Sequence, residues 1–345
     1  MRVTLVFPGI ALPGFDSFKK RPSVDANFID HGLASVGAAA KAAGHAVGLI
    51  DLRALSGWEH FRSLVRSSDT PVDRDLFDVS GELLTPMVPR LPLPFITTNA
   101  GRGCPFKCNF CQPAERMVFG NKAKIRSAQN VVDELLHLRD RYGFRSWMAH
   151  DDLFFLNPKW MLEFCDRYQA AGLDQPFICQ MRADMICRFE PVVQRMAEAG
   201  LAWAMIGFES GSQRILDLFE KGTTVEQNLR AAEICRQHGV KVWANIMFGA
   251  PSETKAEALE TVRMVWKIGP EHFSPSFFTP TPGSGMFDVV ERQDLAVVDD
   301  FRGSCRSPDE AKIRGVDYAW LTRAIALAAA GGPEGALATL AGAGA

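Results

Sequence analysis

Residues 103–113 read GCPFKCNFCQP and place Cys104, Cys108 and Cys111 in one short loop. Three thiolates at this C-x3-C-x2-C spacing can ligate three irons at one corner of a cubane iron–sulfur cluster. Such clusters normally take four cysteines, and the next cysteine along the chain is Cys165. One iron is therefore expected to accept a ligand from outside the protein, which is typical of a catalytic cluster. A zinc site with a distant fourth ligand is the alternative, although zinc ligands usually come in paired motifs.

The composition is that of an enzyme-sized chain without the charge of a nucleic-acid-binding protein. The 345 residues predict about two domains. A net charge of −2 gives no electrostatic reason to expect DNA or RNA as a partner. The first residues lack the features of a signal peptide, and no apolar run reaches the about 18 residues of a membrane span. We therefore expect a cytoplasmic protein with no nucleic-acid and no membrane partner.

Beyond residue 94 the sequence alternates between short apolar runs and longer amphipathic runs. The predicted strands are 95–100, 146–152, 177–183, 202–210, 242–249 and 272–280. The predicted helices are 127–142, 158–171, 190–199, 225–238 and 253–268. A repeated strand–helix order predicts parallel strands joined by right-handed crossovers. We therefore predict an α/β fold in which six such units form a partial (β/α)6 TIM-type barrel, with its chemistry at the carboxyl ends of the strands.

The cysteine loop and the motifs that follow it carry a family resemblance. With the aromatic Phe110 before the third cysteine, the loop resembles that of the radical S-adenosylmethionine (radical SAM) superfamily, and further motifs follow in the family's order within residues 95–288. The resemblance implies a [4Fe-4S] cluster held by Cys104, Cys108 and Cys111. It also implies that S-adenosylmethionine chelates the remaining iron through its amino and carboxylate groups.

The resemblance also implies where the cosubstrate binds. The family's Gly-Gly-Glu stretch is replaced here, so either Asp151 or Asp152 would receive the methionine amino group. Arg182 would bind the carboxylate with its guanidinium fork, unless it forms a salt bridge with Asp184 or Glu209. Glu209 would otherwise accept hydrogen bonds from ribose hydroxyls. The residues placed around the nucleoside are Ser210, Asn245 and Gly249.

Residues 1–94 resemble the opening of the cobalamin-binding domain that precedes many radical SAM barrels. One strand–helix–strand unit is predicted, at 2–8, 32–43 and 45–53. A complete five-stranded sheet of this kind needs about 120 residues, so the length disfavours cobalamin as a cofactor. The predicted domains are a small, truncated Rossmann-like βαβ domain with a linker at 1–94, the radical SAM barrel at 95–288 and a C-terminal extension at 289–345.

The implied reaction is reductive cleavage of S-adenosylmethionine to a 5′-deoxyadenosyl radical, which abstracts hydrogen from a small-molecule substrate. A reductant such as flavodoxin or ferredoxin would supply the electron, and rearrangement, ring formation or oxidation would follow. Cobalamin-dependent methyl transfer is the alternative reaction. A non-enzymatic iron–sulfur sensor or scaffold is the alternative of another class, although such a protein needs no nucleoside site. Cys305, beyond the barrel, is a candidate catalytic residue that could donate a hydrogen atom.

Overall fold

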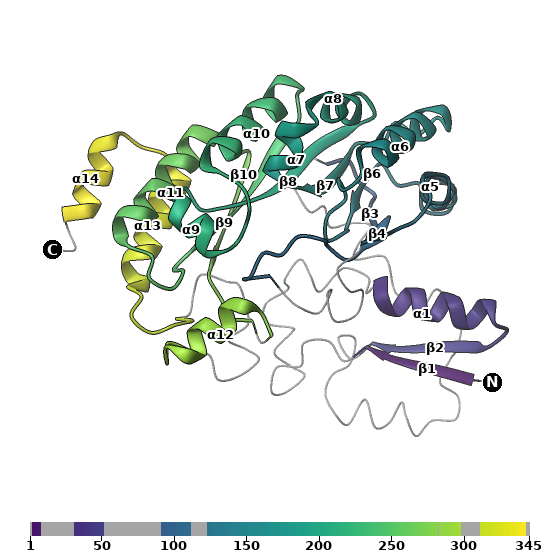
Figure 1. Ribbon diagram of the computed structural model, residues 1–345. Coiled ribbons are helices and arrows are strands. Elements are labelled where there is room, and N and C mark those ends of the chain that lie inside the picture. Colours follow the sequence, from purple (N-terminus) through teal and green to yellow (C-terminus); the bar gives the residue numbers. More distant parts are fainter. Residues whose placement is uncertain are drawn as a thin grey trace. The chain divides into compact units, whose positions relative to one another are not determined.

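The computed structural model describes residues 2–7, 31–51, 91–111, 123–281, 283–297 and 311–342 (Figure 1). The chain divides into two compact units. One comprises residues 1–98 and 139–148, and the other comprises residues 99–138 and 149–345. The domain boundaries expected from the sequence stay a prediction.

The main sheet has six strands in the order β10-β9-β8-β7-β6-β3. They are β3 (Phe95–Thr98), β6 (Ser146–Ala149), β7 (Phe177–Met181), β8 (Leu201–Glu209), β9 (Lys241–Phe248) and β10 (His272–Phe277). The pairs β7–β8, β8–β9 and β9–β10 are parallel. Each strand lies within three residues of its predicted ends. The predicted α/β class and the six-stranded partial barrel are therefore confirmed.

Long helices connect the strands and cover the sheet. They are α5 (Ala128–Tyr142), α6 (Pro158–Ala170), α8 (Glu190–Glu198), α10 (Val225–Gln237) and α11 (Lys255–Ile268). Figure 1 shows α6, α8, α10 and α11 on the same side of strands β7 to β10. Burial along β9 alternates strictly: Val242, Ala244, Ile246 and Phe248 are buried, and the residues between them are half-buried. This alternation is expected when one face of a strand packs under helices.

The helix boundaries follow local capping chemistry. Asn157 precedes α6 and its side-chain oxygen accepts from the main-chain N–H groups of the first turn, as the Asn-Pro pair predicts. Thr224 and Thr254 open α10 and α11 with reciprocal capping boxes. Gly269 ends α11 in the left-handed region, at φ +56°.

Several short or terminal helices were not predicted from the sequence. They are α7 (Ala183–Arg188), α9 (Gln213–Leu218), α12 (Gly285–Arg292), α13 (Tyr318–Ala330) and α14 (Glu334–Gly342). Helices α7 and α9 have six residues each, too few for a periodic apolar pattern to be recognised. They matter because each directly follows the carboxyl end of a strand.

The N-terminal region contains the expected strand–helix–strand unit. Strand β1 (Arg2–Phe7) pairs in parallel with β2 (Ala46–Asp51), and α1 (His31–Ala42) lies between them in the chain. A short antiparallel pair, β4 (Gly101–Arg102) and β5 (Lys124–Ile125), flanks the cysteine loop. Most of the other residues of the predicted N-terminal domain lie outside the described ranges.

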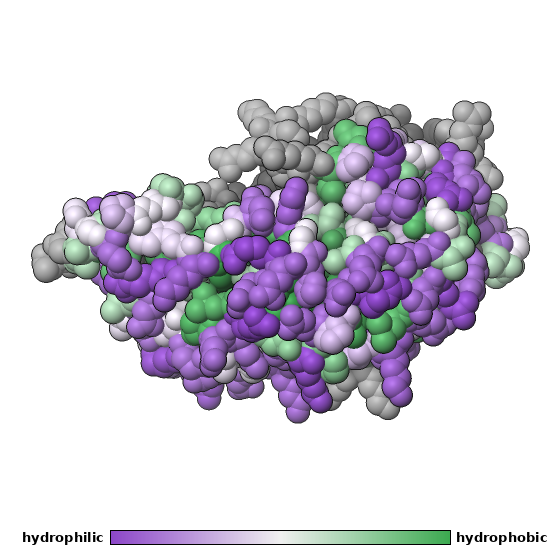
Figure 2. Space-filling model, turned by 90° about the horizontal axis from the view of Figure 1, so that it is seen from above, coloured by the Kyte–Doolittle hydropathy of each residue, from purple (hydrophilic) through white to green (hydrophobic). Residues whose placement is uncertain are grey.

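No helix among the described residues combines the length and apolar character needed to cross a bilayer. On the face drawn in Figure 2, the hydrophobic side chains form small areas separated by polar ones.

Substitution of Gly211 is expected to destabilise the fold, because this residue packs against the main chain of α11. A Cβ at Gly211 would lie 2.5 Å from the Glu260 carbonyl oxygen and 2.6 Å from Thr261 Cα. Gly211→Ala should therefore lower the free energy of unfolding by about 1–3 kcal/mol, as overpacking does, measured by urea denaturation. Gly335→Ala is the control, since nothing lies within 4 Å of its Cβ position. Equal stabilities of the two variants would contradict the expected clash.

Candidate functional site

The three cysteines of the loop 103–111 follow β4. Cys104 and Cys108 are half-buried, Cys111 is exposed, and none of the three forms a disulfide. Burial raises the pKa of the Cys104 thiol. A thiol binds metal as the thiolate, which nearby positive charge stabilises. The surroundings of the loop therefore decide what these thiols can do.

Two adjacent aspartates hold the main chain that leads into the loop. Asp151 is buried and accepts hydrogen bonds from the main-chain N–H groups of Ala100, at 3.1 Å, and Gly101. Asp152 accepts from the N–H of Gly103 at 2.7 Å. Burial raises the pKa of Asp151 to about 7. The two residues expected from the sequence to receive an amino group thus fix the start of the cysteine loop.

The end of the loop is attached to α9 and α12. The Asn109 main-chain N–H donates to the carbonyl of Phe219 at 3.0 Å, and its side-chain amide donates to the carbonyl of Leu218 at 2.8 Å. The Asn109 carbonyl accepts from Met286 N at 2.9 Å. The Phe110 ring lies 4.8 Å from the Phe219 ring, within an apolar cluster. This packing gives a physical reason for an aromatic residue before the third cysteine.

Arg182 reaches the loop from the end of β7. Arg182 is 6% exposed, and its guanidinium carbon lies 3.7 Å from the centre of the Phe106 ring. Nη1 donates to Cys108 Sγ at 3.5 Å, and Nη2 donates to the Lys221 carbonyl at 2.7 Å. Nε forms a salt bridge with Asp184 at 2.9 Å, which is the alternative considered from the sequence. The guanidinium therefore places a fixed positive charge beside one thiol of the loop.

Glu209 ends β8 and pairs with Lys221 rather than with Arg182. Its backbone is in the left-handed region, at φ +62°, and the register with β9 shifts at this point. Lys221 Nζ lies 2.9 Å from Glu209 Oε1, and both side chains are nearly buried. A Cβ at Gly207 would overlap the Glu209 carboxylate and lie 2.9 Å from Lys221 Nζ. Glycine at position 207 therefore leaves room for this ion pair.

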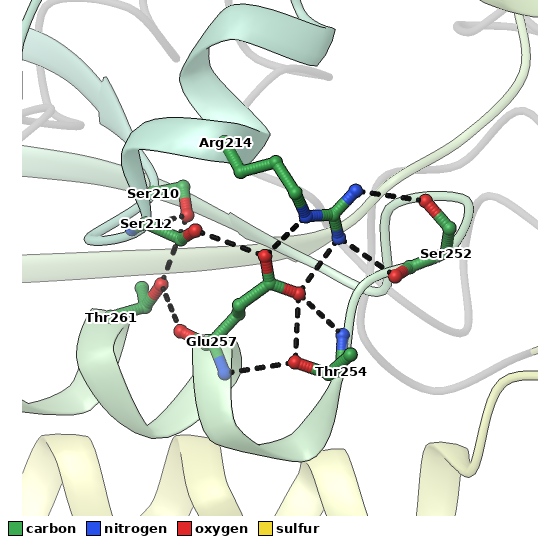
Figure 3. A network of polar contacts seen from close by, with 7 residues as sticks. All are labelled: Ser210, Ser212, Arg214, Ser252, Thr254, Glu257 and Thr261. Atoms are coloured by element: carbon green, nitrogen blue, oxygen red, sulfur yellow. Dashed lines mark hydrogen bonds and ion pairs between the residues drawn. The ribbon is translucent and has the colours of Figure 1, made fainter.

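A polar network joins the turn after β8 to the loop after β9 (Figure 3). Arg214 on α9 donates to Glu257 on α11, with Nη2 2.7 Å from Oε2, and to the Ser252 carbonyl at 2.8 Å. Ser212 Oγ donates to Glu257 Oε1 at 3.2 Å. Hydrogen bonding from Arg214 lowers the pKa of Glu257 to about 2. The network ties two strand-end loops to the same helix.

Ser210 belongs to this network and is fully buried. Its hydroxyl lies 3.1 Å from the hydroxyl of Thr261 on α11, which also accepts from the N–H of Gly211 at 2.9 Å. Ser210 therefore holds the turn after β8 against α11.

Asn245 and Gly249 lie at the end of β9. Asn245 pairs in register with Gly207 of β8 and accepts from the indole N–H of Trp243 at 3.0 Å. Gly249 has φ +77°, and its N–H donates to the Glu253 carboxylate. Burial raises the pKa of Glu253 to about 7. This carboxyl group fixes the turn that follows β9.

The structure brings three of the expected site residues into one group and adds a lysine that the sequence analysis did not select. Cys108, Arg182, Lys221 and Glu209 form one connected set. Lys221 was not singled out from the sequence, where it looks like a solvated lysine after a short segment. Cys305 lies outside the described residues. The expected roles of these residues in cosubstrate binding stay a prediction.

The donor set of the loop fits an iron–sulfur cluster in its chemistry. It offers three thiols without a disulfide, and one of them accepts an N–H···S hydrogen bond from an arginine. Within the described part of the chain, no three His, Cys, Asp or Glu side chains are grouped closely enough to hold a metal ion. The loop thus supplies the ligands, but their thiols do not meet at one point in this structure.

Four other cysteines lie in apolar stretches of the sequence that predict core positions; three of them are buried, and Cys187 is half-buried. Cys165, Cys179 and Cys235 are fully buried. Burial raises the pKa of Cys165 and of Cys235 to about 12. These thiols are therefore protonated near neutral pH and are poor metal ligands.

Comparison with known proteins identifies the central region. Residues 98–265 match the family model described as the radical SAM superfamily. An uncharacterized methyltransferase of Pyrococcus horikoshii is 29% identical over 61% of this chain and 45% of its own length. An anaerobic magnesium-protoporphyrin IX monomethyl ester cyclase of Cereibacter sphaeroides is 28% identical over 67% of this chain and 38% of its own length. The chain therefore spans less than half the length of these relatives.

Solved structures share the fold. The radical S-adenosylmethionine methyltransferase TsrM from Kitasatospora setae, with cobalamin and a [4Fe-4S] cluster bound, aligns with a TM-score of 0.51 and 21% identity, over 58% of this chain and 37% of that chain. The cobalamin-dependent radical enzyme OxsB aligns with a TM-score of 0.52 and 14% identity, over 86% of this chain and 53% of that chain.

The Arg214–Glu257 pair predicts a pH-dependent stability. Because the Glu257 pKa falls from 4.5 to about 2 on folding, the contribution of the pair is complete above pH 4.5 and is lost as the pH falls toward 2. Glu257→Gln should therefore lower Tm at pH 7, and its difference from the wild type should narrow between pH 4.5 and pH 2 in circular dichroism melts.

The control is Glu163→Gln, which removes an exposed i,i+4 pair with Arg167. Such pairs contribute about 0–1 kcal/mol, so its Tm should follow that of the wild type at every pH. A Glu257→Gln difference that stays constant down to pH 2 would contradict the linkage.

Proposed function

We propose that this chain is a radical SAM enzyme that generates a 5′-deoxyadenosyl radical and abstracts hydrogen from a small molecule. The match of residues 98–265 to the radical SAM superfamily supports this proposal. The observation that carries the proposal is the contact between the two halves of the expected site. Arg182, at a strand end, donates to Cys108 in the cysteine loop. A sensor or scaffold would need the loop but would not need a nucleoside site.

Cys104, Cys108 and Cys111 would hold a [4Fe-4S] cluster. When bound, such a cluster supplies one electron to S-adenosylmethionine, which breaks the S–C5′ bond of the cosubstrate. The protein's own contribution is to hold the loop and to stabilise thiolate. Asp151 and Asp152 fix the start of the loop through its N–H groups. Arg182 places positive charge and an N–H donor beside Cys108.

The carboxyl ends of β8 and β9 would hold the nucleoside. Glu209, buried and charge-paired, is suited to accept hydrogen bonds from ribose hydroxyls. Asn245 and Gly249 offer a side-chain amide and a main chain without a Cβ on the neighbouring strand. Ser210 would stabilise this surface through its hydroxyl contact with Thr261 on α11. The amino group would lie near Asp151 or Asp152, and the carboxylate near Arg182.

The electron would come from a reductant such as flavodoxin or ferredoxin, and the substrate would be a small molecule. The substrate radical could then rearrange, close a ring or be oxidised. One relative is named as a cyclase, which is an example of ring closure. That name does not determine the reaction of this chain.

Cobalamin-dependent methyl transfer is the second candidate function. Relatives named as methyltransferases favour it, and so does the cobalamin-dependent class of the solved structures that share the fold. The strand–helix–strand unit of β1, α1 and β2 is consistent with the beginning of a cobalamin-binding domain. The two candidates share the cysteine loop and differ in the need for a corrinoid.

The cysteine loop is tested by its iron content. After anaerobic reconstitution the wild type should bind about four irons per chain, the content of one cubane, and should form 5′-deoxyadenosine from S-adenosylmethionine with dithionite. Replacing Cys104, Cys108 and Cys111 by Ala should abolish both. Cys165→Ala is the control and should retain both, because Cys165 is buried on α6. A full iron complement in the triple variant would overturn the proposal.

The two candidate reactions are separated by the corrinoid content. If hydrogen abstraction is the reaction, the protein expressed with ample cobalamin should show only the broad absorption of an iron–sulfur cluster, because that reaction needs no corrinoid. The spectrum is recorded after desalting. A stoichiometric corrinoid band would reverse the order of the two candidates and make methyl transfer the leading function.

A further inference from the structure

Lys221 is a buried lysine whose place the expected cosubstrate contacts do not explain. It is 7% exposed and lies in the loop after α9, not directly after a strand in the sequence. Removing an ammonium from water is unfavourable unless the charge is paired. The groups around Lys221 must therefore compensate for the cost of burying its ammonium.

Three contacts place Lys221 at the junction of the site. Its Nζ forms the ion pair with Glu209 at 2.9 Å. Its main-chain carbonyl accepts from Arg182 Nη2 at 2.7 Å. Its Nζ also lies 5.7 Å from the centre of the Phe110 ring. Phe110 stands between the second and third cysteines in the sequence. Lys221 thus contacts the β8 end, the β7 end and the cysteine loop at once.

The position of the lysine is fixed from both sides. Its N–H donates to the Leu216 carbonyl of α9 at 3.0 Å, so the backbone is held by the end of that helix. On the other side, Gly207 leaves space for the ammonium and the carboxylate. Glu209 itself is held at φ +62°, a conformation that persists in non-glycine residues only when the surroundings enforce it.

Resting on the proposed function, we infer that Lys221 is a positioning residue of the S-adenosylmethionine site that acts through Glu209. The ammonium donates to Glu209 Oε1 and fixes the orientation of the carboxylate, so that Oε2 is the oxygen that accepts a ribose hydroxyl. Hydrogen bonds to a carboxylate are stronger than hydrogen bonds between neutral groups. Without the ammonium, the buried carboxylate would lose its partner and turn away from the nucleoside.

The test is a double-variant cycle on the reconstituted protein, with the dissociation constant for S-adenosylmethionine measured by calorimetry. Lys221→Met should weaken binding by about tenfold or more, the size of one lost charge-assisted hydrogen bond. Lys221→Arg should restore most of the affinity, because it returns the positive charge. Glu209→Gln should also weaken binding. Adding Lys221→Met to Glu209→Gln should weaken it no further, since the lysine acts through the carboxylate.

The matched control is Lys267→Met, which removes an exposed ammonium from α11 and should leave affinity unchanged. Wild-type affinity in Lys221→Met, or additive losses in the double variant, would overturn the inference, because additivity indicates an independent structural role. If Lys221→Met does not fold, as judged by far-UV circular dichroism, the affinities of Glu209→Gln and of the double variant are compared instead. Equal affinities support the inference, and a weaker affinity of the double variant overturns it. Neither of these two proteins buries an unpaired carboxylate at position 209.

The inference and the proposed function fail in different ways. A wild type that takes up iron but neither binds nor cleaves S-adenosylmethionine overturns the proposed function and the inference with it. A wild type that cleaves the cosubstrate while Lys221→Met binds it normally overturns the inference alone.

Discussion

The cysteine loop has no regular secondary structure, so its conformation depends on hydrogen bonds from the elements around it. Main-chain polar groups must find partners when they are withdrawn from water. Here Asp151 and Asp152 satisfy N–H groups at the start of the loop, and Asn109 connects its end to α9 and α12. Arg182 contacts its middle through Phe106 and Cys108. Residues outside the loop therefore determine the conformation of the segment that carries the three thiols.

This constraint gives the strand-end residues two tasks. Asp151 and Asp152 look like ligand-binding carboxylates in the sequence, yet both serve the main chain of the loop in the structure. Arg182 is engaged by Asp184, by the Lys221 carbonyl and by Cys108. A residue that holds the loop also sets the distance between the loop and the strand ends proposed to bind the nucleoside. Under the proposed function, the same side chains would therefore support the cluster and bind the cosubstrate.

The sequence predicted the sheet well because its strands are short apolar runs separated by amphipathic helices with clear caps, such as Asn157 and Thr254. It also placed Arg182 and Glu209 at strand ends. It missed α7 and α9, which are too short to show a helical period. It also missed Lys221, because its burial and its pairing with Glu209 arise only when the loop after α9 folds back onto β8. The pairing of Glu209 could not be chosen from sequence, since Arg182 and Lys221 are equally plausible partners by charge.

Charge-assisted hydrogen bonds also explain why the carboxyl ends of β8 and β9 form one structural unit. Glu209 and the turn after β8 are attached to α11 through Ser210 and Ser212, and the loop after β9 is attached to the same helix through Arg214, Glu257 and Ser252. A shift of either loop would break charge-assisted hydrogen bonds, which are worth more than neutral ones. The strained backbone of Glu209 is stable in such surroundings because its neighbours on both sides are fixed. The surface proposed to bind the nucleoside is therefore fixed by contacts between the strand-end loops and α11.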